Sequence, residues 1–252
     1  MKIQYCSDLH LEFSENNYFL KQHPLEIGGE VLLLAGDILP FSLHKRQNAF
    51  IDYVADNFEA VYWIPGNHEY YQYDAGSVAD PLHEEIRSNV WLVNNQVIQY
   101  KEVNFICSTL WSKINVLNAL DIQRSVSDFF AINWQGKKFT TRQFNELHQS
   151  CVSFLKTATS KYDGAKNIVV THHVPTLMHY PPQYLNSSIN EVFVVELFDF
   201  IESCNAAFWI YGHHHCNTPA FKIGNTTMLT NQLGYVRQNE HHSFYPAAII
   251  EI

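Results

Sequence analysis

The sequence predicts an α/β fold in which one mixed sheet, or two stacked sheets, is flanked by helices. In the first half of the chain, short apolar segments typical of strands alternate with segments of helical periodicity. The second half adds segments typical of antiparallel hairpins. The 252 residues are 46% hydrophobic, which is enough for one large core or for two small ones. Because no repeat, low-complexity tract or charged linker interrupts the chain, we expect a single domain over residues 1–252.

The short apolar segments of the first half are predicted strands, namely Lys2–Cys6, Val31–Ala35, residues 61–64, residues 90–93, Gln96–Tyr100 and residues 103–109. The segment Val31–Ala35 is apolar at every position and ends at Gly36-Asp37, which is typical of a strand buried on both faces. The apolar residues of segment 44–58 recur at helical spacing and predict a helix. We also expect a helix over residues 81–87.

The second half is predicted to open with helix and loop over residues 115–134. Thr140 or Thr141 then caps a long helix, whose apolar stripe is formed by Phe144, Leu147, Cys151, Phe154 and Leu155. The later elements are expected to be strands at 167–170, 207–211, 220–223, Thr226–Leu229 and 245–252, a Pro- and Tyr-rich loop at 175–188, and a helix at 191–203. Gly224-Asn225 has the length and composition of a two-residue hairpin turn.

The charge balance of the chain argues against one class of partner. The formal net charge is −9, with only 16 Lys and Arg residues and no basic run. Proteins that bind long nucleic acids gain most of their affinity by neutralising phosphates, so we expect no long duplex partner. The sequence leaves open a short oligonucleotide held through metal ions.

Cysteine usage and hydrophobicity indicate the compartment. The five cysteines are scattered, odd in number and without a CxxC pair, which favours free thiols in a reducing compartment. The chain begins directly with a strand-like segment, and its longest apolar runs are far too short to span a membrane. We therefore expect a cytoplasmic protein with no membrane association.

Residue types that ligate metal ions follow five of the predicted strands. They are Asp8 and His10, then Asp37, then Asn67 and His68, then His172 and His173, and finally His213 and His215. The carboxyl ends of parallel strands share one edge of an open α/β sheet, so we expect these clusters to converge there. Each cluster alone is weak evidence, whereas five of them aligned at strand ends are a strong indication of a site.

The three histidines at 213–215 follow Gly212 and a predicted strand. Residues two apart in extended backbone point to the same side, which would pair Asp8 with His10 and His213 with His215. His214 is then expected to point away as a bystander. A ligand set of Asp, Asn and His without cysteine differs from structural zinc sites, and it exceeds what one ion needs. It fits two adjacent ions of Mn, Fe or Zn, bridged by a carboxylate.

In this pattern the sequence resembles the calcineurin-like metallophosphoesterase superfamily, whose motifs are DxH, GD, GNH[DE], a single H and GHxH. They stand here, in order, as Asp8-Leu9-His10, Gly36-Asp37, Gly66-Asn67-His68-Glu69, His172 and Gly212-His213-His214-His215. The resemblance implies a four-layer α/β/β/α sandwich, with two mixed β-sheets flanked by helices, and a phosphoric ester hydrolase. It covers residues 115–139 and 175–188 only loosely.

The resemblance also implies a role for each motif residue. The first ion would be held by Asp8, His10 and His215, the second by Asn67, His172 and His213, and Asp37 would bridge them. The ions would be Mn, Fe or Zn, with Mn favoured. His68 would face the substrate as the proton donor to the leaving group. A hydroxide bridging the two ions would attack a small phosphomonoester or phosphodiester, with a nucleotide as one candidate.

The sequence departs from the phosphoprotein phosphatases of this superfamily, which extend GD to GDxxDRG. Here Gly36-Asp37 continues as Ile38-Leu39-Pro40-Phe41, so the second acid and the arginine are missing. The carboxylate that would orient His68 is therefore unassigned, and a dedicated protein phosphatase is not expected. Glu69 matches the phosphatase branch but by itself indicates little.

A weaker resemblance to a bacterial branch of cytosolic phosphoesterases bears on substrate contacts. It rests on Leu110-Trp111, on Arg124 with Asp128-Phe129, and on Asn231-Gln232-Leu233-Gly234-Tyr235. Arg124 is a candidate phosphate contact or a plain surface arginine, and His173 either reaches the substrate or lies behind the ligands. The alternative functions are a nuclease on short single-stranded nucleic acid, a non-catalytic metal-binding scaffold of the same fold, and a sensor of one metal ion.

Overall fold

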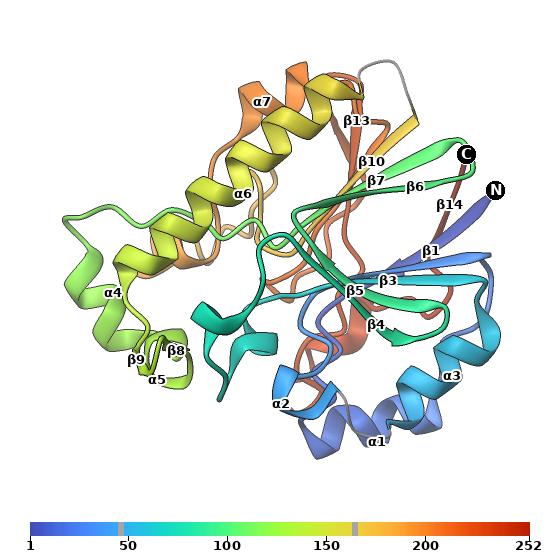
Figure 1. Ribbon diagram of the computed structural model, residues 1–252, viewed down its shortest axis with the longest axis horizontal. Coiled ribbons are helices and arrows are strands. Elements are labelled where there is room, and N and C mark those ends of the chain that lie inside the picture. The colour runs from blue at the N-terminus through green and yellow to red at the C-terminus, as the bar shows by residue number, and fades with distance from the viewer. Residues whose placement is uncertain (45–47, 163–165) are drawn as a thin grey trace.

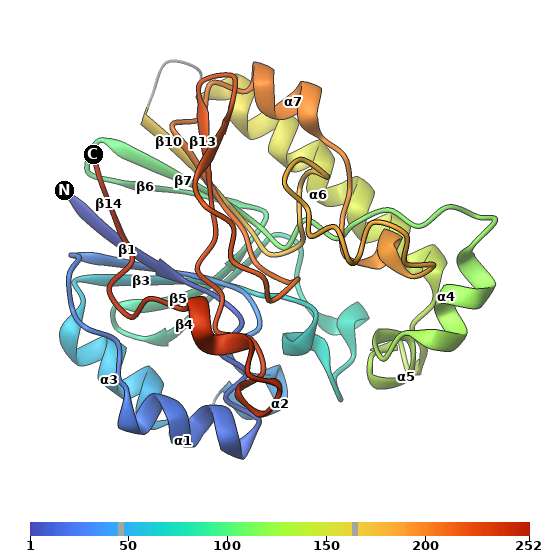
Figure 2. The same cartoon turned by 180° about the vertical axis from the view of Figure 1, so that it is seen from behind.

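Two six-stranded sheets form the centre of the molecule, and helices cover the outer face of each (Figure 1). The structure is a computed structural model of the chain and describes residues 1–44, 48–162 and 166–252. Figure 2 shows the same layers from behind, with the two chain ends side by side. The backbone amine of Met1 lies 2.9 Å from the carbonyl oxygen of Ile252. The predicted four-layer α/β/β/α sandwich of two mixed sheets is confirmed.

The first sheet has the strand order β14-β1-β2-β3-β5-β4. Its central strands are parallel and comprise β1 (Lys2–Cys6), β2 (Val31–Ala35), β3 (Ala60–Ile64) and β5 (Val90–Asn94). The edge strands β14 (Ile249–Glu251) and β4 (Leu82–Arg87) are antiparallel to their neighbours. In register, Tyr5 of β1 lies opposite Leu33 of β2, and Leu33 lies opposite Tyr62 of β3.

The second sheet repeats this plan with the order β12-β13-β11-β10-β7-β6. Its parallel strands are β13 (Thr226–Leu229), β11 (Phe208–Ile210), β10 (Lys166–Thr171) and β7 (Val103–Ser108). The antiparallel edges are β12 (Phe221–Ile223) and β6 (Gln96–Tyr100). The predicted hairpin around Gly224-Asn225 is confirmed as the connection between β12 and β13.

Burial on both faces explains why the central strands are apolar throughout. Successive side chains of a strand point to opposite faces. In β2, Leu33 packs in the core between the two sheets, whereas Leu32 and Leu34 pack in the core beneath the helices. The first sheet is covered by α1 (Ser14–Gln22) and α3 (Ala49–Asn57), and the second by α6 (Thr141–Lys161) and α7 (Phe198–Ser203) (Figures 1 and 2).

Shorter elements lie beyond one end of the sheets. They are α2 (Phe41–His44), α4 (Ala119–Ser125), α5 (Asp128–Ala131), the two-stranded pair β8 (Asn133–Trp134) and β9 (Lys137–Lys138), and 3₁₀ turns at His68–Tyr70, Ala75–Ser77, Asn190–Val192, Val236–Gln238 and Glu240–Ser243. Figure 1 shows α4 and α5, which follow β7 and precede α6 in the chain, projecting to one side. None of the helices in the described ranges is both long and apolar enough to cross a lipid bilayer.

The predicted helix over residues 81–87 is wrong, because this segment forms the edge strand β4. Glu84, Glu85 and Arg87 are residue types that favour helices, but β4 pairs with β5, with a register shift between Glu85 and Arg87. Leu82, at the start of the strand, is buried. Hydrogen bonds to the neighbouring strand therefore override a weak local preference.

Three other elements have shorter bounds than predicted, and the predicted cap of α6 makes a different hydrogen bond. The helix expected at 191–203 is confined to Phe198–Ser203, because the chain before it forms a 3₁₀ turn and pairs Val174 with Val194. The helix expected at 44–58 is described as α3 from Ala49, with Asn48 as its cap, and residues 45–47 lie outside the described range. The last strand is shorter than predicted. Thr140 occupies the N-cap of α6, yet its hydroxyl bonds to the side chain of Gln143 rather than to a backbone amide.

Gly36 allows β2 to turn into the loop that carries Asp37. Its φ is +92°, a backbone conformation that favours glycine. A Cβ atom at this position would overlap the imidazole ring of His172, which comes from the other sheet. The close approach of the two sheets at this point therefore requires a residue without a side chain.

Replacing Gly36 by alanine should destabilise the fold more than the same change at Gly136. Both glycines have positive φ, +92° and +75°, so each alanine carries a backbone penalty of about 1–2 kcal/mol. An added Cβ at Gly136 meets nothing within 4 Å, whereas Gly36→Ala adds a clash with His172 worth a further ~1–3 kcal/mol. Urea denaturation measures both free energies of unfolding. Equal losses would show that the His172 ring moves aside without cost.

Candidate metal centre

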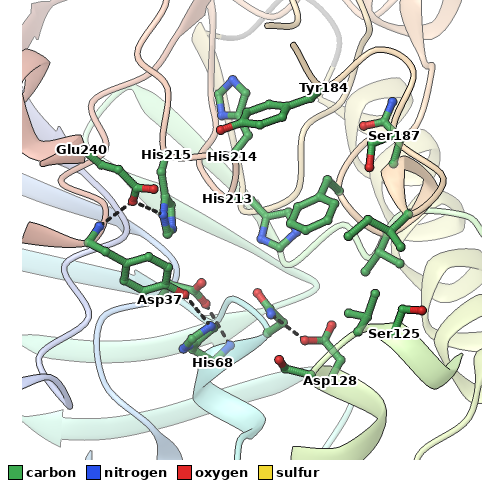
Figure 3. Close-up of a pocket in the computed structure, with 18 of the residues that line it drawn as sticks. Asp37, His68, Ser125, Asp128, Tyr184, Ser187, His213, His214, His215 and Glu240 are labelled. Carbon is green, nitrogen blue, oxygen red and sulfur yellow. Dashed lines mark hydrogen bonds and ion pairs between the residues drawn. The ribbon is translucent and has the colours of Figure 1, made fainter. Parts of the chain in front are cut away.

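A cavity of about 420 Å³ lies where loops from both sheets meet (Figure 3). The loops after β2 and β3 contribute Asp37, Asn67 and His68, and the loop after β11 contributes His213 and His215. These residues are far apart in the sequence but follow parallel strands. The predicted convergence of polar clusters at strand ends is therefore seen in the structure, although the strands belong to two sheets rather than one.

One group of possible metal ligands combines Asp8, His10, Asp37 and His215. The Nε2 atoms of His10 and His215 are 3.0 Å apart. His215 Nε2 is 3.4 Å from Asp8 Oδ1, and His10 Nε2 is 3.7 Å from Asp37 Oδ2. Asp8, His10 and Asp37 are buried, so their polar atoms face one another rather than bulk water.

A second group combines Asp37, His172 and His213. His172 Nε2 is 3.4 Å from Asp37 Oδ2 and 3.0 Å from His213 Nδ1. The side-chain oxygen of Asn67 lies 3.3 Å from the same His172 nitrogen. Asp37 Oδ2 thus faces both groups, with His10 on one side and His172 on the other.

The backbone that carries these residues is strongly turned. Five of the site residues are non-glycine residues with positive φ: Asp8 (55°), His10 (47°), Asp37 (56°), His213 (81°) and His215 (51°). Such conformations are uncommon outside glycine and concentrate at functional sites, where the surrounding structure enforces them.

The argument that His213 and His215 point to the same side was wrong. It assumed extended backbone, but β11 ends at Ile210 and both histidines have positive φ. The two rings therefore face different groups, with His215 near Asp8 and His213 near His172. His214, expected to be a bystander, lies outside both groups; its Nδ1 pairs with the side chain of Gln232.

Hydrogen bonds behind three of the rings fix which nitrogen carries the proton. His215 Nδ1 is 2.7 Å from Glu240 Oε2, His10 Nδ1 is 3.2 Å from Glu12 Oε1, and His172 Nδ1 is 2.9 Å from the carbonyl oxygen of Ala35. These oxygens can only accept, so each Nδ1 donates, and in the neutral ring the Nε2 lone pair faces the group. Converging lone pairs and carboxylates fit metal cations.

The carboxylates of the site stabilise positive charge on the neighbouring histidine rings. Burial by itself would lower the pKa of His172, but the charge of Asp37 outweighs burial and raises that pKa to about 9. For His215, burial is likewise outweighed by Asp8 and Glu240, which raise its pKa to about 10. Without an ion, protons on these rings balance the carboxylates. A divalent cation in each group would supply the same compensation.

His68 lies at the edge of the cavity, beside both groups. Its Nδ1 is 2.8 Å from Glu12 Oε1, and its Nε2 is 3.3 Å from the hydroxyl of Tyr235. The ring stacks on Tyr71, with centroids 4.1 Å apart. Burial would lower its pKa, but the carboxylates of Asp37 and Glu12 raise it. Glu12 therefore occupies the position of the orienting carboxylate that the sequence left unassigned.

Asn67 is oriented by a buried acid. Its amide nitrogen donates to Asp128 Oδ1 at 2.9 Å, which leaves the amide oxygen directed at His172. The hydroxyl of Tyr71 donates to the same Asp128 oxygen at 2.8 Å. Burial raises the pKa of Asp128, and these two hydrogen bonds oppose that shift.

Two predicted substrate contacts do not line the cavity. Arg124 is exposed on α4, next to Ser125, which does line it. His173 is fully buried, with Nδ1 3.3 Å from the carbonyl oxygen of Thr109 and its ring 4.2 Å from that of His213. Burial lowers the pKa of His173 to about 3, so the ring is neutral. It packs behind the second group.

Sequence reasoning missed Glu12, Glu240 and Asp128 as partners of the site. Glu12 follows Asp8 and His10 at the same two-residue step, which was an available signal. Asp128 was noted only as a neighbour of Arg124 within a loosely covered region. Glu240 follows no strand and has no motif, so only its position beside His215 identifies it.

Comparison with known proteins identifies the family. Residues 1–217 match the family model of the calcineurin-like phosphoesterases. An uncharacterized protein of Acanthamoeba polyphaga mimivirus is 30% identical over 278 residues, covering 99% of this chain and 96% of that protein. The phosphopantetheinyl hydrolase of Mycobacterium tuberculosis has a similar fold, with a TM-score of 0.72 and 16% identity over 99% of this chain and 95% of that one. The chain belongs to the calcineurin-like phosphoesterase family.

Proposed function

We propose that the protein is a binuclear metal-dependent hydrolase of small phosphomonoesters or phosphodiesters. The observation that carries this proposal is the position of Asp37. Its Oδ2 lies 3.7 Å from His10 Nε2 and 3.4 Å from His172 Nε2, so one carboxylate faces two separate groups of ligand atoms. A carboxylate shared between two groups of ligand atoms suits a pair of adjacent ions.

Each proposed ion has its own protein ligands. Asp8, His10 and His215 would hold the first, Asn67, His172 and His213 the second, and Asp37 both. The mixed imidazole and oxygen donors suit Mn, Fe or Zn. When bound, the two ions would supply a water nucleophile at neutral pH and neutralise the phosphoryl oxygens. Manganese as the preferred ion and a cytoplasmic location stay predictions from the sequence.

The proton for the leaving group would come from a side chain of the protein. His68 lines the cavity; its Nδ1 is held by Glu12, and its Nε2 lies 3.3 Å from the hydroxyl of Tyr235, which also lines the cavity. A proton at Nε2 can therefore pass to the oxygen of the departing alcohol, and the charge of Glu12 stabilises the protonated ring before transfer. Asp37 Oδ1 accepts from the backbone nitrogen of His68 at 2.9 Å, which fixes the ring relative to the metal groups. Glu12 acts through His68 and is a positioning residue.

Hydrolysis of p-nitrophenyl phosphate and bis(p-nitrophenyl) phosphate with Mn²⁺, together with a metal count by elemental analysis, tests the proposal. We expect two metals per chain and turnover of at least one ester, lost on chelation and restored by Mn²⁺. Two metals without turnover would point to the binding scaffold. One metal per chain would contradict the proposal of a binuclear site and favour a sensor of one metal ion.

His68→Ala should lower kcat by roughly 10²–10⁴-fold while both metals stay bound, because the ring is expected to transfer a proton and not to ligate. Asp37→Ala should instead empty or disorder both metal groups. His83→Ala, on the exposed edge strand β4, is the matched control and should change neither quantity. Loss of one metal from His68→Ala would make His68 a ligand.

Glu12→Gln should slow esters with poor leaving groups by roughly 10–100-fold, and p-nitrophenyl esters much less. A stable phenolate leaves without a proton, whereas an alkoxide needs the proton that Glu12 helps to hold on His68. Rates are compared at saturating Mn²⁺ because Glu12 also contacts His10. The control Glu15→Gln removes the same charge from an exposed position. Equal slowing of both esters would place the effect of Glu12 on His10 instead.

A further inference from the structure

The cavity has two chemically different ends. The end at Asp37 contains the metal groups and His68. The other end is lined mainly by neutral side chains, among them Ser125, Ser127, Tyr184, Ser187, Ile189 and Asn190. Figure 3 shows Ser125 and Ser187 on the side of the cavity away from Asp37 and Glu240. This neutral end is available to the part of the substrate that is not the phosphoryl group.

Charged residues of the cavity have one sign. Apart from histidines, the charged side chains among the described lining residues are Asp37, Asp128 and Glu240, and none of the described lining residues is Lys or Arg. A second anionic group on the substrate would lose water on entering and find no cation to replace it. Without a cationic partner, such a group should bind less well than a neutral group of the same size.

Two acceptors at the neutral end lack partners. Asp128 Oδ2 and Asn190 Oδ1 are buried and accept no hydrogen bond from the described part of the chain. Asp128 is only 1% exposed, and its other oxygen already accepts from Asn67 and Tyr71. Because both oxygens are themselves buried, the donors of a ligand would instead meet the exposed hydroxyl groups of Ser125, Ser127 and Ser187, which can accept hydrogen bonds.

We propose that the alcohol part of the substrate is small, carries no negative charge and presents hydrogen-bond donors beside an apolar or aromatic surface. This inference rests on the proposed hydrolase function. The tyrosine rings and Phe193 provide the apolar surface. Nucleoside polyphosphates and nucleic acid strands fit poorly, because each extra phosphate would lie away from the metal groups, where none of the described lining residues is Lys or Arg.

A matched pair of substrates tests the inference. The carboxamide of 4-carbamoylphenyl phosphate and the carboxylate of 4-carboxyphenyl phosphate have nearly the same size, but only the carboxamide is neutral and carries N–H donors. After correction for the uncatalysed rates, kcat/KM should favour the carboxamide by at least about tenfold, which corresponds to ~1.4 kcal/mol. Equal values, or a preference for the carboxylate, would overturn the inference.

A variant with an added positive charge makes the test more specific. Ser187→Lys places a cation at the neutral end of the cavity and should abolish or invert the preference for the carboxamide. Ser153→Lys adds the same charge on the exposed side of α6, away from the lining residues, and should leave the preference unchanged. If both variants shifted the preference equally, net charge rather than the cavity wall would set it.

A binding measurement separates this inference from the proposed function. If p-nitrophenyl phosphate is hydrolysed but no preference is found, only the inference fails. If no ester is hydrolysed, the proposed function fails, and binding of the two alcohols still tests the cavity. In ligand-observed NMR of the intact protein, 4-hydroxybenzamide should bind and 4-hydroxybenzoate should not. Binding of the benzoate with equal or greater affinity would contradict the inference.

Discussion

The carboxylate of Glu69 holds together the two loops on which the site depends. It accepts hydrogen bonds from the backbone nitrogens of Asp37 (2.9 Å), Ile38 (2.7 Å) and Gly66 (2.7 Å), and from Trp63 Nε1 (2.9 Å). Burial raises the pKa of Glu69 to about 7. Because the loops after β2 and β3 share this acceptor, Asp37 and His68 are placed relative to each other by main-chain contacts and not by side-chain packing alone.

The site concentrates buried polar groups that would destabilise an ordinary core. Asp8 and Asp37 are buried between imidazole rings, and Glu12 and Glu240 hold two of those rings from behind. Buried charges are tolerated only when they are paired or coordinate metals. Left-handed backbone at the ligand positions adds local strain. Both features have a physical rationale if cations occupy the two groups, and the apolar strands beneath supply the rigidity that keeps the ligands in place.

Local sequence determined most of the fold. Apolar runs such as Val31–Ala35 predict buried strands because both of their faces must be covered, and the stripe of α6 predicts its contact with the second sheet. The segments at 81–87 and 191–203 were mispredicted because their helical preference is weak. The first pairs with the next strand, β5, and the second begins with a 3₁₀ turn and an isolated bridge between Val174 and Val194. Which strands form which of the two sheets also depends on contacts between residues far apart in the chain.

The sequence by itself determined which residues gather at the site, because each ligand type stands directly after a strand and the strand ends must meet. The family resemblance implied how these residues divide into two groups, but only the tertiary structure shows the physical reason for the division. Left-handed backbone directs His213 and His215 into different groups, a result that no two-residue spacing predicts. Glu12, Glu240 and Asp128 belong to the site only because the fold brings them within hydrogen-bonding distance of its residues. The neutral end of the cavity is formed by loops, whose sequences show no periodicity. Hydrogen-bond partners and cavity walls are set by three-dimensional proximity, which local patterns do not encode.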